Sequence, residues 1–203
     1  MPELVSRQFG VANWNILSAR IDAAAPGIKP LVMPEGWTDG SVNPQGYFRM
    51  GLDPERAGCA MIQSTPLADH QLQTQYGTMA QVISAEPFRG GAVRVACELM
   101  AEALEGTGTI WLRIDDRSGR VLHFENLLQR PGIAVRGTED WKGFAITLDV
   151  PDAAESVYFG FMMHGRGTLR ARSFSVDLAE AGNAPDQRRP YRFERPNNLH
   201  FGA

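Results

Sequence analysis

The sequence of 203 residues is poor in several features that define large classes of proteins. It has only two cysteines, Cys59 and Cys97, and both lie in strand-like runs, so we expect buried free thiols rather than a disulfide framework. The cysteine spacing and the scattered histidines do not match a structural zinc site. No apolar run approaches the length of a membrane span, and the N-terminus lacks a basic segment followed by an apolar run. We therefore expect a cytoplasmic protein without a membrane partner.

The sequence also has no large excess of charge of one sign. Its net charge of −3 gives no basic surface that would favour a nucleic-acid partner. Hydrophobic residues make up 43% and charged residues 21%, which is ordinary for a soluble globular protein. Helical periodicity is nearly absent and there is no internal repeat. The length suits one large all-β domain or one domain with extensions.

What the sequence does contain is a succession of short strand-like runs separated by turn signals. The runs cover residues 47–52, 59–64, 78–84, 93–100, 110–116, 120–125, 144–150, 157–163 and 169–178. Loops are expected over 102–108 and 126–140, and Phe174, Val176 and Leu178 are expected to face inward. The pattern favours a jelly-roll β-sandwich over residues 36–179, with an N-terminal arm or first strand at 1–35 and a polar tail containing Pro and Arg at 180–203.

Residues 110–131 predict a β-hairpin with two different faces. Asp116-Arg117-Ser118-Gly119 has turn composition, and a left-handed Gly119 would pair Asp116 with Arg120. Stepping outward, this register puts four apolar residues on the core face: Leu112, Ile114, Leu122 and Phe124. The other face would carry Trp111, Arg113, Asp115, His123 and Glu125, with Arg113 opposite His123 and Trp111 opposite Glu125. That face is either a solvated outer surface or the floor of a binding groove.

Short motifs in a fixed order resemble a known kind of domain. They include Trp111-Leu112-Arg113-Ile114-Asp115, Phe124-Glu125-Asn126, Trp141-Lys142-Gly143-Phe144 and Gly165-Arg166-Gly167-Thr168. The motifs at Trp141 and Gly165 resemble the C-terminal half of galactose-binding-like jelly rolls, an ending that carbohydrate-binding modules often share. The wider run, with the motifs at Trp111 and Phe124, looks closer still to a little-characterised bacterial domain sometimes joined to helix-turn-helix regulators. The resemblance implies a jelly-roll sandwich with a ligand-binding role. Such modules usually carry an acidic pair in the last strand, where this chain has Leu169-Arg170-Ala171-Arg172, so we expect neither structural calcium nor another cofactor.

The binding hypothesis centres on Trp111 as an aromatic platform for a carbohydrate or another small polar ligand. Planar polar groups around it would supply hydrogen bonds, and the candidates are Arg113, Asp115, His123, Glu125, Asn126, Arg130 and Gln81. Trp37 and Trp141 are expected to seal the core edge instead. The favoured function is therefore non-catalytic binding.

Two alternatives stay open. One is a small acid–base enzyme, such as a lyase, isomerase or hydrolase, in which His123 is the base, Glu125 orients it and Arg113 stabilises an oxyanion. No nucleophile motif is present, so no catalytic residue is assigned. A metal site from His123, Glu125 and His164 is weaker still. The other alternative is a protein-interaction module, with a homodimer formed through the Trp111 surface.

Overall fold

The computed structural model describes residues 29–41, 46–66, 75–128, 130 and 132–180. In this part of the chain the elements are β1 (Thr38–Asp39), β2 (Phe48–Leu52), β3 (Ala60–Ser64), β4 (Tyr76–Ser84), the 3-10 turn η2 (Glu86–Phe88), β5 (Ala92–Asp116), β6 (Val121–Glu125), β7 (Val135–Asp149), β8 (Ala154–His164) and β9 (Thr168–Ala179). Most of the expected N-terminal arm and nearly all of the expected C-terminal tail lie outside the described residues.

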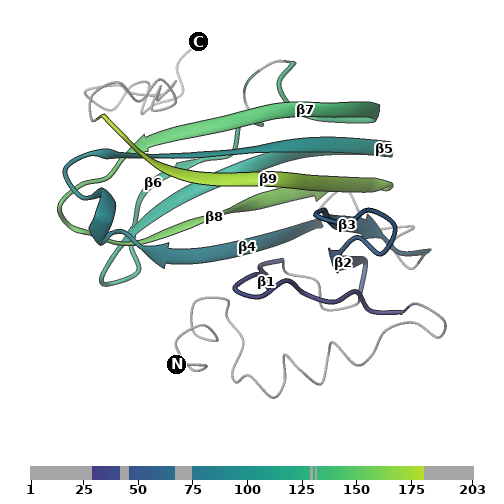
Figure 1. The fold of residues 1–203 in the computed structure, drawn as a ribbon, viewed down its shortest axis with the longest axis horizontal. Coiled ribbons are helices and arrows are strands. Elements are labelled where there is room, and N and C mark those ends of the chain that lie inside the picture. Colours follow the sequence, from purple (N-terminus) through teal and green to yellow (C-terminus); the bar gives the residue numbers. More distant parts are fainter. Residues whose placement is uncertain (1–28, 42–45, 67–74, 129, 131, 181–203) are drawn as a thin grey trace, which may run out of the picture.

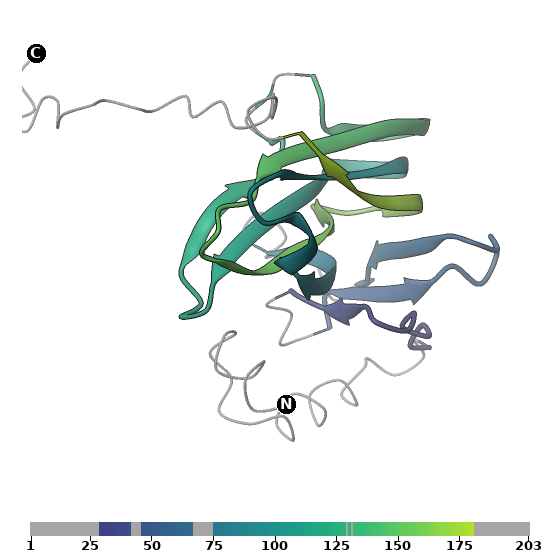
Figure 2. The same cartoon turned by 60° about the vertical axis from the view of Figure 1, so that its left-hand side comes forward.

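The strands form two layers that share β5. Its first part, residues 92–102, pairs with β7 on one side and β9 on the other. Its last part, residues 107–116, pairs with β8 and β6. One layer therefore has the order β2-β3-β9-β5-β7 and the other β1-β4-β8-β5-β6, with antiparallel neighbours throughout (Figures 1 and 2). This arrangement confirms the all-β sandwich expected from the sequence.

The loop expected over residues 102–108 is wrong, because β5 continues through it as a bent strand. Ala103 takes a left-handed conformation at the bend, with a φ of 48°. The turn between β8 and β9 packs directly against it, and the Glu105 N–H donates to the Arg166 carbonyl at 2.9 Å. A Cβ at Gly106 would lie 2.0 Å from the His164 carbonyl oxygen, so only glycine allows this approach. Backbone pairing across the bend replaces the expected loop.

The core lies between the layers and is built from the inward-facing residues of both. Its largest fully buried side chains include Phe159, Phe161, Ile62, Leu99 and Met163. Trp37 packs edge-on against this core, with its ring centroid 5.8 Å from that of Phe159 and 4.9 Å from that of Phe174, as expected. Leu178, near the end of β9, lies on the core side of the sheet as expected, since it is the cross-strand neighbour of the buried Val93, but its side chain is 66% exposed.

Both cysteines are buried free thiols, as the sequence predicted. Burial, assisted by the nearby Glu98 carboxylate, raises the pKa of the Cys97 thiol, so this thiol stays protonated. No helix in the part of the chain that the structure describes has the length and apolar character needed to cross a bilayer.

The close approach at the β5 bend yields a matched pair of stability tests. Gly106→Ala forces a methyl group against a backbone carbonyl, so we expect it to lower the free energy of unfolding by about 2–3 kcal/mol. Gly143→Ala, also within a strand, places its Cβ where nothing lies within 4 Å, and it should be neutral or slightly stabilising. Urea denaturation measures both, and equal effects would contradict this account of the bend.

Candidate functional site

The hairpin turn forms as predicted. Gly119 has a φ of 81°, its N–H donates to the Asp116 carbonyl at 2.9 Å, and the Asp116 N–H donates to the Arg120 carbonyl at 3.0 Å. The Asp116 carboxylate also accepts hydrogen bonds from the Ser118 hydroxyl and the Ser118 N–H, which lower its pKa. Turn chemistry alone therefore determined the first pairs of the hairpin.

Beyond the turn the predicted register is wrong by one residue. Asp115 pairs with Val121 as expected, but Ile114 pairs with His123, so Leu122 is an extra residue in a β-bulge. Phe124 consequently lies opposite Arg113 and is 54% exposed, although the sequence pattern placed it in the core. The predicted pairs Arg113–His123 and Trp111–Glu125 are replaced by Arg113–Phe124 and Leu112–Glu125.

The bulge moves His123 and Glu125 to the side of the sheet that carries Leu112 and Ile114. The Glu125 carboxylate there caps the loop that follows β6. One oxygen accepts the N–H groups of Asn126 and Leu127 at 2.9 and 2.8 Å, and the other pairs with Arg130 at 3.2 Å. Glu125 thus holds the loop after β6 in place. Arg113 and His123 do not face each other, as the acid–base alternative required.

The outer face of the layer β6-β5-β8-β4 carries the remaining candidates, and we call it the Trp111 face. Its residues follow from the pairing of alternate positions on the four strands: Phe124; Thr109, Trp111, Arg113 and Asp115; Tyr158, Gly160 and Met162; Tyr76, Thr78, Ala80 and Val82. Gln81 points to the opposite side, where it is the cross-strand neighbour of the core residue Phe159, so it does not belong to this face.

Trp111 is held across the middle of the face. Its indole N–H donates to the Thr78 hydroxyl at 2.8 Å, and that hydroxyl donates to the Phe161 carbonyl at 2.9 Å. Trp111 lies on β5 and Thr78 on β4, so the indole spans β8 between them, where its cross-strand neighbour is Gly160. A Cβ at Gly160 would lie 2.0 Å from the Met79 carbonyl oxygen. The indole N–H is therefore satisfied within the protein, and the ring is held in one orientation across β8.

Arg113 is fixed by a buried carboxylate. Its Nε donates to Asp115 Oδ1 at 2.7 Å and its Nη2 donates to Asp115 Oδ2, while the Asp115 side chain is only 1% exposed. The hydrogen bond to Asp115 raises the pKa of Arg113. The guanidinium carbon also lies 5.3 Å from the centroid of the Tyr158 ring. The charge is balanced and the guanidinium is held in one orientation above the sheet.

These contacts create a row across four strands: Phe124 on β6, Arg113 on β5, Tyr158 on β8 and Val82 on β4. The two ends of the row are open, since Phe124 is 54% and Val82 52% exposed. The sequence missed Tyr158 and Val82 because β8 is apolar on both faces and β4 was not placed beside it.

At the other end of the Trp111 face, the rings of Tyr76 and His164 lie 5.6 Å apart. Burial lowers the pKa of His164, opposed by a hydrogen bond that the imidazole donates to the backbone of Gln75. His164 therefore titrates below its ordinary value of 6.5. The described residues contain no group of three or more His, Cys, Asp and Glu side chains that could hold a metal ion.

In the last strand, β9, this chain has arginines at the place where the resemblance implied an acidic pair. Arg170 is 6% exposed, and its guanidinium bridges the carboxylates of Asp53 and Glu102, each at 2.6 Å. Burial opposes the ionisation of Asp53, but hydrogen bonds from the Glu55 N–H and from Arg170 outweigh it and lower the pKa of Asp53. The positive charge between these carboxylates belongs to the protein itself.

The Arg170 bridge should dominate the electrostatic part of stability. Arg170→Leu leaves Asp53 buried without its partner, so we expect a loss of about 3 kcal/mol in the free energy of unfolding. Arg172→Leu is the matched control on the same face of β9, because its pair with Glu98 at 2.7 Å is 38% and 39% exposed. It should cost about 1 kcal/mol or less. Urea titrations that rank the two variants in the reverse order would refute this assignment.

The lowered pKa of His164 gives a pH dependence with a definite sign. The unfolded chain binds a proton at His164 more readily than the folded chain, so stability is lost as pH falls below 6.5. We expect the fall in free energy of unfolding between pH 7.5 and 5.5 to become shallower in His164→Gln. Guanidinium denaturation at both pH values measures the slope, and parallel profiles for the two proteins would exclude the effect.

No protein-family model matches the chain. It is 28% identical over 139 residues to an uncharacterised HTH-type (helix-turn-helix) transcriptional regulator, YbfP of Bacillus subtilis (strain 168), covering 66% of this chain and 45% of the regulator. The chain thus spans less than half the length of that curated relative. The match confirms the resemblance to a bacterial domain that occurs in helix-turn-helix regulators.

Solved carbohydrate-binding modules are also similar to the chain. A CBM4 module has a TM-score of 0.48 and 19% identity, covering 74% of this chain and 94% of the module. The CBM22-1 xylan-binding domain of Paenibacillus barcinonensis Xyn10C has a TM-score of 0.47 and 10% identity, covering 74% of this chain and 90% of that domain. Because both TM-scores are below 0.5, these similarities carry no argument about function, which is inferred instead from the chain's own side chains.

Proposed function

We propose that the protein is a non-catalytic binding module for a carbohydrate or a similar small polar ligand, which it holds on the Trp111 face. One observation carries the proposal: three aromatic side chains, Trp111, Tyr158 and Phe124, share an outer sheet face with an anchored arginine, Arg113. An outer sheet face needs no such set for folding, and Phe124 in particular is left 54% exposed.

The chemistry of the face matches that of a sugar. Sugars present C–H faces that stack on aromatic rings and hydroxyl groups that pair with planar polar groups. Arg113 uses Nε and Nη2 on Asp115, which leaves N–H donors of the guanidinium for a ligand. Since Asp115 balances the charge, the face suits a neutral, hydroxyl-rich ligand rather than a strongly anionic one. Anchored groups also lose little freedom on binding.

The similarity to a transcriptional regulator supports a sensory role for this binding, in which the ligand signals to a DNA-reading part of such a protein. We infer a cytoplasmic location, which the buried free thiols of Cys59 and Cys97 support, since such thiols suit a reducing compartment.

A second candidate is self-association through β6. This strand pairs only with β5 among the described strands and carries two exposed apolar residues, Val121 at 46% and Phe124 at 54%. An edge strand with such side chains can pair with a second copy of the chain. The two candidates share Phe124, and the measurement of mass in the experiment below separates them.

The proposed function predicts a loss of affinity when the aromatic row is shortened. We expect a panel of neutral mono- and oligosaccharides to include at least one that raises the melting temperature of the wild-type protein. Phe124→Ala should weaken that ligand at least about tenfold, or ~1.4 kcal/mol, in titration calorimetry. Trp111→Ala should abolish the binding, because it removes the platform itself.

Leu178→Ala is the control, since it truncates an exposed apolar residue on the other layer, 66% exposed against 54% for Phe124. It should leave the affinity unchanged. If no saccharide stabilises the wild-type protein, or if Phe124→Ala binds as tightly as wild type, the proposal fails. A dimer mass in analytical ultracentrifugation that becomes monomeric in Phe124→Ala would favour self-association instead.

A further inference from the structure

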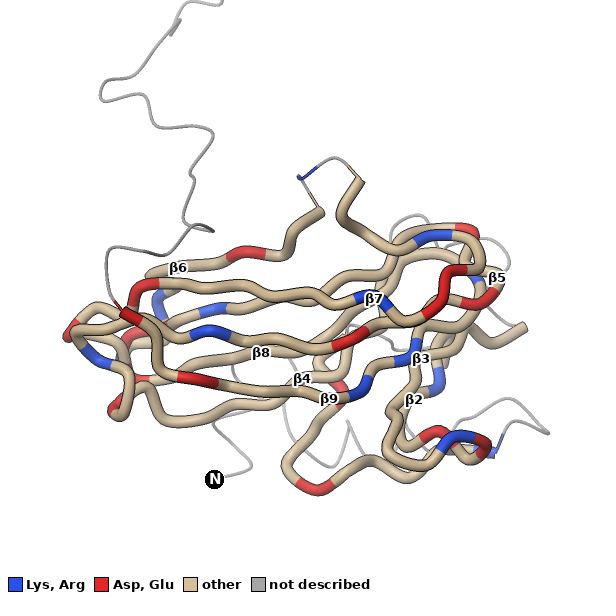
Figure 3. The backbone as a smooth tube through the Cα atoms, turned by 45° about the horizontal axis from the view of Figure 1, so that its top comes forward, with Lys and Arg blue, Asp and Glu red and all other residues tan. Residues whose placement is uncertain are grey.

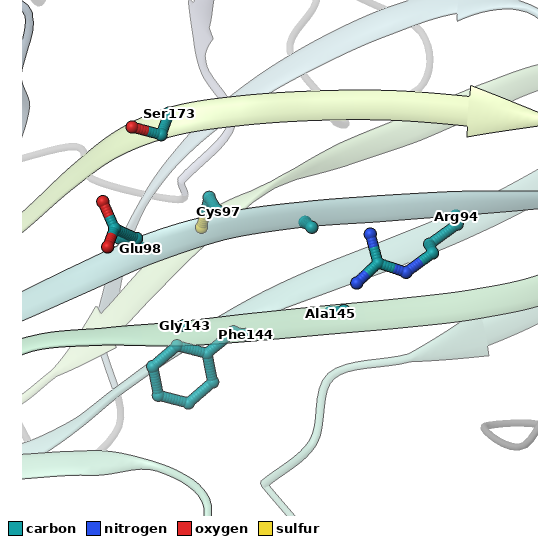
Figure 4. Close-up of a pocket in the computed structure, with 8 residues that line it drawn as sticks. Arg94, Cys97, Glu98, Gly143, Phe144, Ala145 and Ser173 are labelled. Carbon is teal, nitrogen blue, oxygen red and sulfur yellow. The ribbon is translucent and has the colours of Figure 1, made fainter.

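The other layer of the sandwich has a hollow on its outer face. It is shallow and open to solvent, measures about 320 Å³, and is lined by Arg94, Ala96, Cys97, Glu98, Gly143, Phe144, Ala145 and Ser173 (Figure 4). These residues come from β5, β7 and β9, so the hollow belongs to the layer opposite the Trp111 face. The function proposed above does not involve it.

The floor of the hollow is made of small residues at paired positions. Ala96 on β5 lies opposite Ala145 on β7, and Glu98 lies opposite Gly143. A Cβ added at Gly143 would have no heavy atom within 4 Å, so space is open above the strand there. On the third strand, Ser173 has a φ of 55° within a bulge of β9 that interrupts the pairing between Ala96 and Glu98. A left-handed serine in a bulge often accompanies a functional site.

The two ends of the hollow differ in charge. Glu98 at one end pairs with Arg172, whose guanidinium carbon lies 4.0 Å from the centroid of the Trp141 ring. Trp141 was expected to seal the core edge, and that expectation is wrong, because it lies within β7 and stacks on Arg172. Arg94 at the other end is exposed, and Figure 4 shows Ala145 between Arg94 and Glu98.

Arg94 has no hydrogen bond or ion pair to any residue that the structure describes. Its neighbour on β9, Asp177, instead accepts a hydrogen bond from the Ser175 hydroxyl at 3.0 Å. Acidic and basic residues are interspersed along β5, β7 and β9 (Figure 3), so individual side chains rather than an overall field set the chemistry of the hollow. The group available there is a guanidinium without a partner among the described residues, next to the methyl groups of Ala96 and Ala145.

We propose that this hollow is a second ligand site, which takes a small hydroxylated carboxylate. The ligand carboxylate pairs with the Arg94 guanidinium in a two-point hydrogen-bonded contact. Its carbon skeleton lies on Ala96, Ala145 and Gly143. Its hydroxyl groups donate to the Glu98 carboxylate and to the Ser173 hydroxyl at the far end. The Cα atoms of Arg94 and Glu98 are roughly 13 Å apart along β5, which leaves room for one sugar-acid unit between the side chains.

The test uses D-glucuronate as the probe and D-glucose as its uncharged counterpart, with the full chain labelled for amide NMR. We expect saturable shifts with glucuronate at the amides of Ala96, Gly143, Ala145 and Ser173, and none there with glucose. Arg94→Gln should raise the dissociation constant at least tenfold, since a charge-assisted pair is lost. Gly143→Leu fills the floor and should abolish the shifts.

Two controls separate this site from other effects. Arg117→Gln makes the same change of charge on the hairpin turn and should bind the probe like wild type. Phe124→Ala, which weakens the Trp111 face, should leave the shifts in the hollow unchanged, so the two proposals can fail independently. Shifts that are absent, that fall only on the Trp111 face, or that persist in Arg94→Gln would overturn the proposal.

Discussion

The two layers of this protein depend on the bend in one strand. β5 runs for 25 residues and gives its first part to one sheet and its last part to the other. The bend is possible because backbone meets backbone there without side chains between: a Cβ at Gly106 would lie 2.0 Å from the His164 carbonyl oxygen, and one at Gly167 would lie 2.4 Å from the Ala103 carbonyl oxygen. A strand that changes sheets closes the sandwich at one corner.

Both candidate sites are consequences of this shared strand. Trp111 and Arg113 lie on its last part, and Arg94 and Glu98 lie on its first part, so the sites occupy opposite outer faces of one sandwich. The two sites differ in whether the charge of their arginine is neutralised by a neighbouring carboxylate. Arg113 is neutralised by a buried Asp115 among aromatic rings, whereas Arg94 has no partner among the described residues and stands over a floor of small residues. We therefore propose a neutral ligand for the first surface and an anion for the second.

Much of the fold was readable in the sequence. Alternating apolar residues predicted most strands, and the turn Asp116–Gly119 predicted the first pairs of the hairpin. The loop expected at 102–108 failed because its glycines signal a turn locally, while their actual role is to let another segment approach. The predicted face of the hairpin was wrong for two residues, since one extra residue, Leu122, reverses the faces of β6 beyond it and moves His123 and Glu125 to the side opposite Trp111.

The sequence by itself determined the all-β class, the turn of the hairpin, and Trp111, Arg113 and Asp115 as side chains on one face, because alternation and turn chemistry act between near neighbours. Only the tertiary structure decided that Tyr158 and Val82 complete the row with Phe124, and that Arg94, Ala145 and Ser173 border one hollow. Those groupings arise from pairing between strands that are distant along the chain, and the core packing of both layers selects that pairing.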